Sequence, residues 1–328
     1  MTEKNILEMV LPDPVLSAFD LPLRAVFHPY GFPLELATNS SDVIAAAEEG
    51  WGRFQPHCDA TPLRFEVGVV PGSNTPLPAQ SVFRSREHLM IAVADAENFI
   101  TCDFHRDYGY AWITEAVARD HALVRYRFLI AGGLSLVEKR HFAPLHCGLV
   151  MRNGRGVALF GDSFAGKSTL SYACARAGWT FVCDDGANLV RGANDRYAVG
   201  DPFALRLRED AKTLFPELEG RMPIVRPNGK LGIEILTSEL PIQLAQGCSV
   251  DHIVFLNRGE RGPAEISRYS KDATLEWFGR YVAFGPADLC AAQLRSYQRL
   301  LTAGIWELRY SGLDEAIRRL EQLVDCGG

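Results

Sequence analysis

The stretch VALFGDSFAGKST, residues 157–169, decides how the second half of this chain folds. A short apolar run over 157–160 leads into a loop that fits G-x-x-x-x-G-K-[ST], and the residues from 168 to 177 are predicted to form a helix. The glycines of such a loop let backbone N–H groups converge on phosphate oxygens, and the N-terminus of the helix adds a positive dipole end. The candidate nucleotide-binding residues are therefore Gly161, Asp162, Ser163, Phe164, Ala165, Gly166, Lys167, Ser168 and Thr169.

Two side chains of this loop carry its chemistry. Lys167 is expected to reach the β- and γ-phosphates of a nucleotide, and the Ser168 hydroxyl is expected to bind Mg²⁺. The alternative is a chance match, but the position between a predicted strand and a predicted helix argues against it. The loop by itself does not distinguish a kinase from an ATPase or a GTPase.

A pair of carboxylates follows the next predicted strand, at 179–183. In a parallel sheet the two strands end at the same edge, so Asp184 and Asp185 are expected beside the phosphate loop. Neighbouring side chains of an extended segment point opposite ways, so one can face Mg²⁺ while the other faces an incoming hydroxyl. We assign Asp184 as the base and Asp185 as a metal ligand, although the two roles can be exchanged. A solvated turn is the alternative, because Gly186 follows.

Four further residues are candidates for the same site. His146 precedes a predicted hairpin that can fold it back toward the phosphates, although its spacing alone favours a structural histidine. Arg206, Arg208 and Lys230 are candidates for neutralising a transferred phosphoryl group, where negative charge develops. For these three cations the alternative is ordinary surface charge.

The first third of the chain differs in pattern from the rest. It is predicted to be rich in short strands, at 23–28, 33–37, 63–69, 89–94, 99–104 and 110–113, with a helix after Ser40 or Ser41 and a helical stretch over 116–136. The last three strands are expected to form an antiparallel set. We therefore predict an α/β (α+β) protein with a smaller β-rich domain over 1–130, for which substrate recognition is the suggested role, and a phosphate-loop domain over 131–328.

Composition excludes several classes of protein. The 34 basic and 40 acidic residues among 328 give 34 − 40 = −6, and no long basic run is present, so binding to nucleic acid or to anionic membranes is not expected. The longest apolar stretch, 128–137, is about half the length that crosses a bilayer, and the N-terminus does not resemble a signal peptide. The eight scattered cysteines form no CxxC pair and are expected to be reduced core thiols of a cytoplasmic protein.

The combined motifs resemble a known family. Leu145-His146, the loop GDSFAGKS at 161–168 and the stretch FVCDDGANLV at 181–190 are similar, at matching spacings, to the catalytic core of the HPr serine kinase/phosphorylase family. The resemblance covers roughly residues 140–190. It is looser over His252–Arg258 and over the tail WELRYSGLDEAIRRLEQLV at 306–324.

The resemblance implies a fold like that of phosphoenolpyruvate carboxykinase and Mg²⁺-dependent transfer of the γ-phosphate of ATP to a serine hydroxyl. It implies that Lys167 and Ser168 bind phosphate and Mg²⁺, that Asp184 and Asp185 share the base and metal roles, and that His146 assists near the phosphates. It also suggests a homo-oligomer.

The chain departs from bona fide HPr kinases in two places. It lacks their Glu-x-Arg-Gly-Leu-Gly-Ile signature, and Thr169 stands where a Glu usually follows the loop serine. The expected acceptor is therefore a serine or another hydroxyl of a peptide, protein or small molecule. The alternative function is a nucleotide-binding regulator without phosphotransfer.

Overall fold

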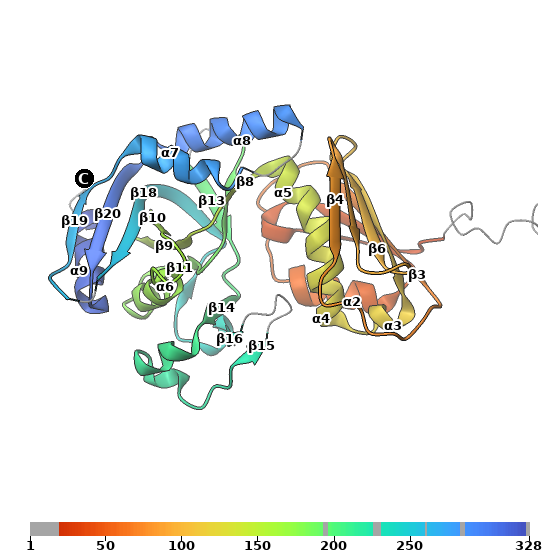
Figure 1. Cartoon of the computed structure of the whole chain (residues 1–328), viewed down its shortest axis with the longest axis horizontal. Coiled ribbons are helices and arrows are strands. Elements are labelled where there is room, and N and C mark those ends of the chain that lie inside the picture. Colours follow the sequence, from red (N-terminus) through yellow and green to blue (C-terminus); the bar gives the residue numbers. More distant parts are fainter. Residues whose placement is uncertain (1–19, 193–195, 226–230, 260, 283–285, 326–328) are drawn as a thin grey trace, which may run out of the picture.

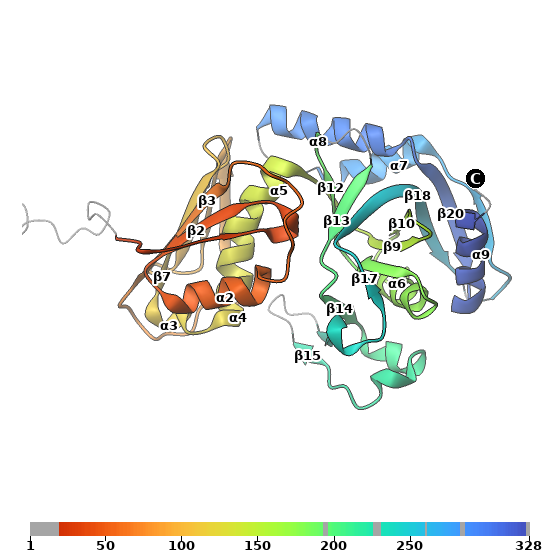
Figure 2. The ribbon, with the colours of Figure 1, turned by 180° about the vertical axis from the view of Figure 1, so that it is seen from behind.

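The computed structural model describes residues 20–192, 196–225, 231–259, 261–282 and 286–325. It has a mixed α/β architecture with one seven-stranded sheet, one ten-stranded sheet and one small three-stranded sheet. Figures 1 and 2 show the first sheet with its helices beside the larger body that holds the other two sheets. The α/β fold class predicted from the sequence is thus confirmed at this level of description.

The seven-stranded sheet is built from the first third of the chain. Its strands are β1 (Leu23–Phe27), β2 (Leu34–Thr38), β3 (Leu63–Val70), β4 (Val82–Arg86), β5 (Leu89–Val93), β6 (Phe99–Asp103) and β7 (Tyr108–Thr114). They lie in the order β1-β2-β3-β7-β6-β5-β4. The antiparallel pairing expected for the last three strands is confirmed, but β3 pairs in parallel with both β2 and β7. The edge strand β4 was not predicted.

Helices cover one face of this sheet. They are α2 (Ser41–Trp51), α3 (Glu115–Ala118), α4 (His121–Val124), the π-helical η3 (Arg125–Leu134) and α5 (Ser135–His141), and a 3-10 turn, η2 (Pro29–Gly31), joins β1 to β2. The single helix expected over 116–136 is interrupted because Asp120 caps a new helix, accepting a hydrogen bond from the backbone N–H of Leu123.

Beyond residue 130, the helical segment formed by η3 and α5 packs closely on the seven-stranded sheet. A Cβ on Gly132 would lie 2.4 Å from the ring of Phe65, so only glycine allows this approach. Leu134 and Val137 belong to the same buried core. The second large sheet begins at Phe142, so the chain passes from one sheet to the next later than residue 130.

The ten-stranded sheet forms the centre of the remaining chain. Its strands are β8 (Phe142–Leu145), β9 (Gly148–Arg152), β10 (Arg155–Phe160), β11 (Thr180–Cys183), β12 (Ala187–Val190), β13 (Tyr197–Gly200), β17 (Gln243–Leu244), β18 (Gly247–Arg258), β19 (Glu265–Arg268) and β20 (Gly304–Tyr310). Its helices are α6 (Lys167–Arg176), α7 (Lys271–Gly279), α8 (Ala287–Leu300) and α9 (Leu313–Asp325).

Two apolar layers enclose this sheet. Alternate residues of β10 point to opposite faces: Leu159 packs in the core that contains α6 and α9, whereas Phe160 packs in the core that contains α7 and α8. In Figure 1, α7 and α8 accordingly cover the upper side of the sheet, while α6 lies below it.

The sheet is mixed rather than wholly parallel. Strands β10 and β11 are not neighbours, because β9 lies between them and pairs antiparallel with both. Both strands therefore still run in the same direction, and β18 and β20 run parallel to β10. The carboxyl ends of β10, β11, β18 and β20 meet at one edge, which is where the candidate site residues were expected.

The small sheet lies below α6. It consists of β14 (Ala204–Leu207), β16 (Leu231–Leu236) and β15 (Ile224–Val225). The 3-10 turns η4 (Glu209–Thr213), η5 (Pro216–Leu218) and η6 (Thr237–Glu239) accompany it. Leu205 and Ile235 are fully buried against Tyr172 of α6 and Phe215, so this sheet is fixed to the phosphate-loop helix.

The state of the cysteines and the length of the apolar helices were also predicted from the sequence. None of the seven described cysteines forms a disulfide and five of them are buried, which fits the expectation of core thiols. No helix among the described residues combines the length and apolar character needed to span a bilayer.

Candidate active site

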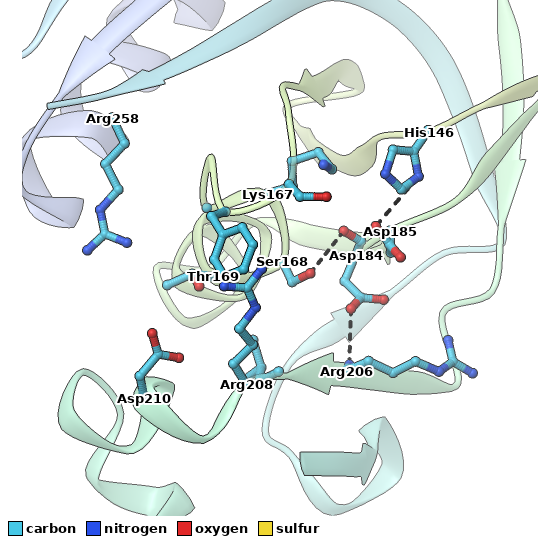
Figure 3. Close-up of a pocket in the computed structure, with 14 residues that line it drawn as sticks. His146, Lys167, Ser168, Thr169, Asp184, Asp185, Arg206, Arg208, Asp210 and Arg258 are labelled. Carbon is cyan, nitrogen blue, oxygen red and sulfur yellow. Dashed lines mark hydrogen bonds and ion pairs between the residues drawn. The ribbon is translucent and has the colours of Figure 1, made fainter. Parts of the chain in front are cut away.

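A pocket opens at the edge where β10, β11 and β18 end (Figure 3). It is lined by residues of the predicted loop, of the Asp-Asp pair and of the small sheet. The lining residues are His146, Ser163, Phe164, Gly166, Lys167, Ser168, Thr169, Asp184, Asp185, Arg206, Leu207, Arg208, Asp210 and Arg258. The structure therefore brings most of the sequence-predicted site residues into one place.

The remaining loop residues, Gly161, Asp162 and Ala165, belong to the loop but not to the pocket wall. Gly166 adopts a left-handed φ of 95°, and a Cβ there would lie 2.5 Å from the Tyr310 hydroxyl oxygen. That hydroxyl donates a hydrogen bond of 3.0 Å to the carbonyl oxygen of Ala165. Tyr310, at the end of β20, thus holds the loop in shape just before α6 begins.

Lys167 directs its ammonium group into the loop. Its Nζ donates to the carbonyl oxygens of Gly161 at 2.9 Å and Asp162 at 3.3 Å, and the residue is only 7% exposed. Burial lowers the pKa of Lys167, while Asp185 acts in the opposite direction. A buried cation is therefore held where the sequence motif predicts phosphate oxygens.

Asp184 is the most unusual carboxyl group of the pocket. It is 1% exposed, and its Oδ2 accepts a 3.1 Å hydrogen bond from the backbone N–H of Arg206. Burial raises the pKa of Asp184 to about 7, with a smaller contribution from Asp185, while Arg206 opposes the shift. The Ser168 hydroxyl donates to the backbone carbonyl of Asp184 at 3.4 Å, which joins the carboxyl segment to the start of α6.

Asp185 points the other way, as the alternation along an extended segment predicts. Its side chain is 53% exposed, and its Oδ1 lies 3.7 Å from Nδ1 of His146. The β9–β10 hairpin thus brings His146 to the pocket, which its spacing alone did not favour. Figure 3 shows Asp185 directed toward His146 and Asp184 directed toward β14.

The cations predicted to neutralise a phosphoryl group are placed differently from one another. The guanidinium of Arg206 lies 3.2 Å from a carboxylate oxygen of Glu234 and 3.8 Å from one of Asp201, so it turns away from the loop and only its backbone N–H faces Asp184. The guanidinium carbon of Arg208 lies 3.3 Å from the ring centroid of Phe164, over the loop. Lys230 lies outside the described residues.

Sequence reasoning missed three lining residues, namely Leu207, Asp210 and Arg258. A signal for Arg258 was present: it closely follows the buried run 252–256, whose strand is the parallel neighbour of β10. Its side chain therefore had to lie at the same sheet edge as the loop. Leu207 and Asp210 carried no comparable signal.

The donor set suits a hard cation. Ser168, Asp184 and Asp185 offer hydroxyl and carboxylate oxygens, which Mg²⁺ prefers. In the part of the chain that the structure describes, no three His, Cys, Asp or Glu side chains form a ready-made metal cage.

Comparison with models of known protein families gave no match. Comparison with curated proteins gave none either. Among solved structures, the chain is similar to the Hpr(Ser) kinase/phosphatase from Coxiella burnetii, at 16% sequence identity over 56% of this chain and 99% of that chain. The TM-score of this match is 0.30, which is too low to establish a common fold.

Proposed function

We propose that this protein is an ATP- and Mg²⁺-dependent kinase that transfers the γ-phosphate to a serine or another hydroxyl. The observation that carries the proposal is Asp184, a buried carboxyl group whose pKa is raised to about 7 beside Lys167 and Ser168. A general base works best when its pKa lies near the operating pH, and burial of a carboxyl group is the usual means of achieving this.

Asp184 accepts the proton of the acceptor hydroxyl, whose oxygen forms the new bond to the γ-phosphorus while ADP leaves. Lys167 exchanges its two loop carbonyl partners for phosphate oxygens. Asp185 and Ser168 hold Mg²⁺, which when bound neutralises charge on the phosphate oxygens. His146 stays beside Asp185 and adds a donor at the edge of the pocket.

Arginines complete the electrostatics of the proposed site. Arg208 lies over the loop and Arg258 reaches the pocket from the opposite side of α6 (Figure 3). Both can stabilise negative charge on the transferred group, whereas the Arg206 guanidinium is directed toward Asp201 and Glu234.

The proposal leaves the acceptor as a peptide, protein or small-molecule hydroxyl. It includes no nucleic-acid or membrane partner, in keeping with the net charge of −6, and a cytoplasmic homo-oligomer is the proposed state. The resemblance to the HPr serine kinase family supports a hydroxyl group as the acceptor. It does not identify the molecule that carries this hydroxyl.

The test follows the γ-phosphate. The protein is incubated with γ-labelled ATP, Mg²⁺ and peptide and metabolite pools from its source, beside Lys167→Ala and Asp184→Asn. Label on an acceptor with wild type alone, while Asp184→Asn still binds ATP, is the expected result. If Asp184→Asn keeps full transfer, Asp184 is not the base. If ATP binds and nothing is labelled, the chain is a nucleotide-binding regulator rather than a kinase.

A further inference from the structure

Phe164 differs from the other residues of the phosphate loop in having an exposed aromatic side chain on a strained backbone. The side chain is 76% exposed, although aromatic rings normally contribute to folding by being buried. Its φ is 75°, in the left-handed region that glycine adopts freely and a bulky residue rarely occupies. Strain that is kept at such an exposed residue points to a role in function rather than in packing.

The ring of Phe164 contacts the guanidinium group of Arg208. The central guanidinium carbon lies 3.3 Å from the ring centroid, so the positive charge sits on the face of the ring. Both side chains line the same pocket as Lys167. Figure 3 shows the Arg208 side chain directed from the end of β14 toward Ser168, at the start of α6.

This ring contact determines the direction of the Arg208 side chain. The carbonyl oxygen of Arg208 accepts a 3.2 Å hydrogen bond from the backbone N–H of Ala211, which fixes the backbone but not the side chain. Asp210 lines the same pocket, yet no carboxylate among the described residues forms an ion pair with Arg208. The Arg208 charge is therefore oriented by an aromatic face and stays available to an anion.

The segment that carries Arg208 also covers the proposed base. Two residues before Arg208, the backbone N–H of Arg206 donates to the Asp184 carboxyl group at 3.1 Å. Arg208 therefore enters the pocket from the side of Asp184. In a phosphotransfer reaction the γ-phosphate lies between the acceptor hydroxyl and the rest of the nucleotide. The terminal phosphate is thus the part of ATP closest to this cation.

We propose that Phe164 is a positioning residue whose ring holds the Arg208 guanidinium over the phosphate loop, and that Arg208 held in this way binds the terminal phosphate of ATP. Because the ring orders the cation before ATP arrives, binding does not have to immobilise a long flexible side chain. The choice of the terminal phosphate rests on the proposed kinase function, whereas the contact between the two side chains does not.

The variants separate the aromatic face from the rest of the loop. Phe164→Leu removes the face, Phe164→Tyr keeps it, and Arg208→Ala removes the cation. Arg258→Ala is the matched control, because Arg258 also lines the pocket but belongs to β18. Since the Phe164 side chain is exposed, both of its variants should keep the Tm of the wild type to within about 2 °C.

The first measurement is the affinity for ATP and for ADP by calorimetry. Phe164→Leu should weaken ATP binding about threefold, the size expected for a cation–π contact at an exposed site, and leave ADP binding unchanged. Phe164→Tyr should bind ATP as the wild type does. Equal losses for ATP and ADP, or the same loss in Phe164→Tyr, would overturn the inference, because either result indicates a general disturbance of the loop.

The second measurement is a double-mutant cycle on ATP affinity. Phe164→Leu should have no further effect in Arg208→Ala, but it should again cost about threefold in Arg258→Ala, since only residues that act together are coupled. An additive loss in Arg208→Ala would show that Phe164 does not act through Arg208.

These outcomes separate the inference from the kinase proposal. If the protein binds ATP but transfers no phosphate, the kinase proposal fails, and the affinities still decide the role of Phe164. If phosphate is transferred and Phe164→Leu binds ATP as the wild type does, the inference alone fails. If calorimetry detects no binding of ATP to the wild type, both are overturned.

Discussion

Asp184→Asn should abolish phosphotransfer and stabilise the folded protein above neutral pH. Burial raises the pKa of Asp184 from an ordinary 3.8 to about 7. Between these two values the unfolded chain is ionised while the folded carboxyl group keeps its proton, so the free energy of unfolding falls as the pH rises through this window. Below about pH 4 the group is protonated in both states, and the penalty disappears.

The size of the penalty follows from the shift. About three pKa units correspond to roughly 4 kcal/mol at pH 8. Asparagine has the same shape and its oxygen can still accept from the Arg206 N–H, but it loses the attraction of the Arg206 charge. We therefore expect a net gain of about 2–4 kcal/mol, or roughly 3–6 °C in Tm for a chain of 328 residues, for Asp184→Asn at pH 8.

The assay is thermal unfolding of wild type and variant at pH 4, 6 and 8, together with the transfer assay. The stabilisation should grow over this range, while transfer falls by at least about 100-fold. Asp185→Asn is the control, since that side chain is half exposed and should give no comparable stabilisation. An Asp184→Asn protein that is no more stable at pH 8, or equally stabilised at pH 4, would refute the argument.

Three further predictions concern the loop and its cation. Lys167→Ala should weaken ATP binding about 10- to 100-fold in calorimetry, because it removes a charged hydrogen-bond donor to phosphate. Unchanged affinity would show that Lys167 does not bind the nucleotide. Gly166→Ala should lower Tm and ATP affinity together, because the new methyl group collides with the Tyr310 hydroxyl, whereas Gly178→Ala, at a similar φ with open space around it, should lower Tm alone. Chelation by EDTA should stop transfer and added Mg²⁺ should restore it; transfer that persists in EDTA would contradict the role assigned to Mg²⁺.

The strand–loop–helix unit and the position of the Asp-Asp pair could be predicted because both depend on residues that are consecutive in the sequence. An apolar run, a glycine-rich turn and a helical stretch need no knowledge of distant partners. The order of strands depends on distant partners, so the position of β9 between β10 and β11 was not predicted. Strand β4 was missed because all five of its residues are exposed at a sheet edge, so they show no alternation.

Charge type was visible in the sequence, but side-chain direction was not. Arg206 and Arg208 look equivalent in the sequence, yet the first guanidinium contacts Asp201 and Glu234 and the second lies over Phe164. Arg208 follows the last residue of β14, so the alternation of the strand does not fix its direction. Arg258 was not assigned to the site because it lies outside the phosphate loop and the Asp-Asp pair. Only the parallel pairing of β18 with β10 brings it to the site.

The basicity of Asp184 shows why local motifs describe such a site incompletely. A carboxyl group at the end of a strand beside a phosphate loop would ordinarily be solvated and fully ionised at neutral pH. Here β14 covers it, and the backbone of Arg206 provides its hydrogen-bond donor. Strand β14 is held by its pairing with β16 and by the core below α6. The raised pKa of Asp184 therefore arises from packing between segments that are separated in sequence, and mutations outside the phosphate loop should be able to alter it.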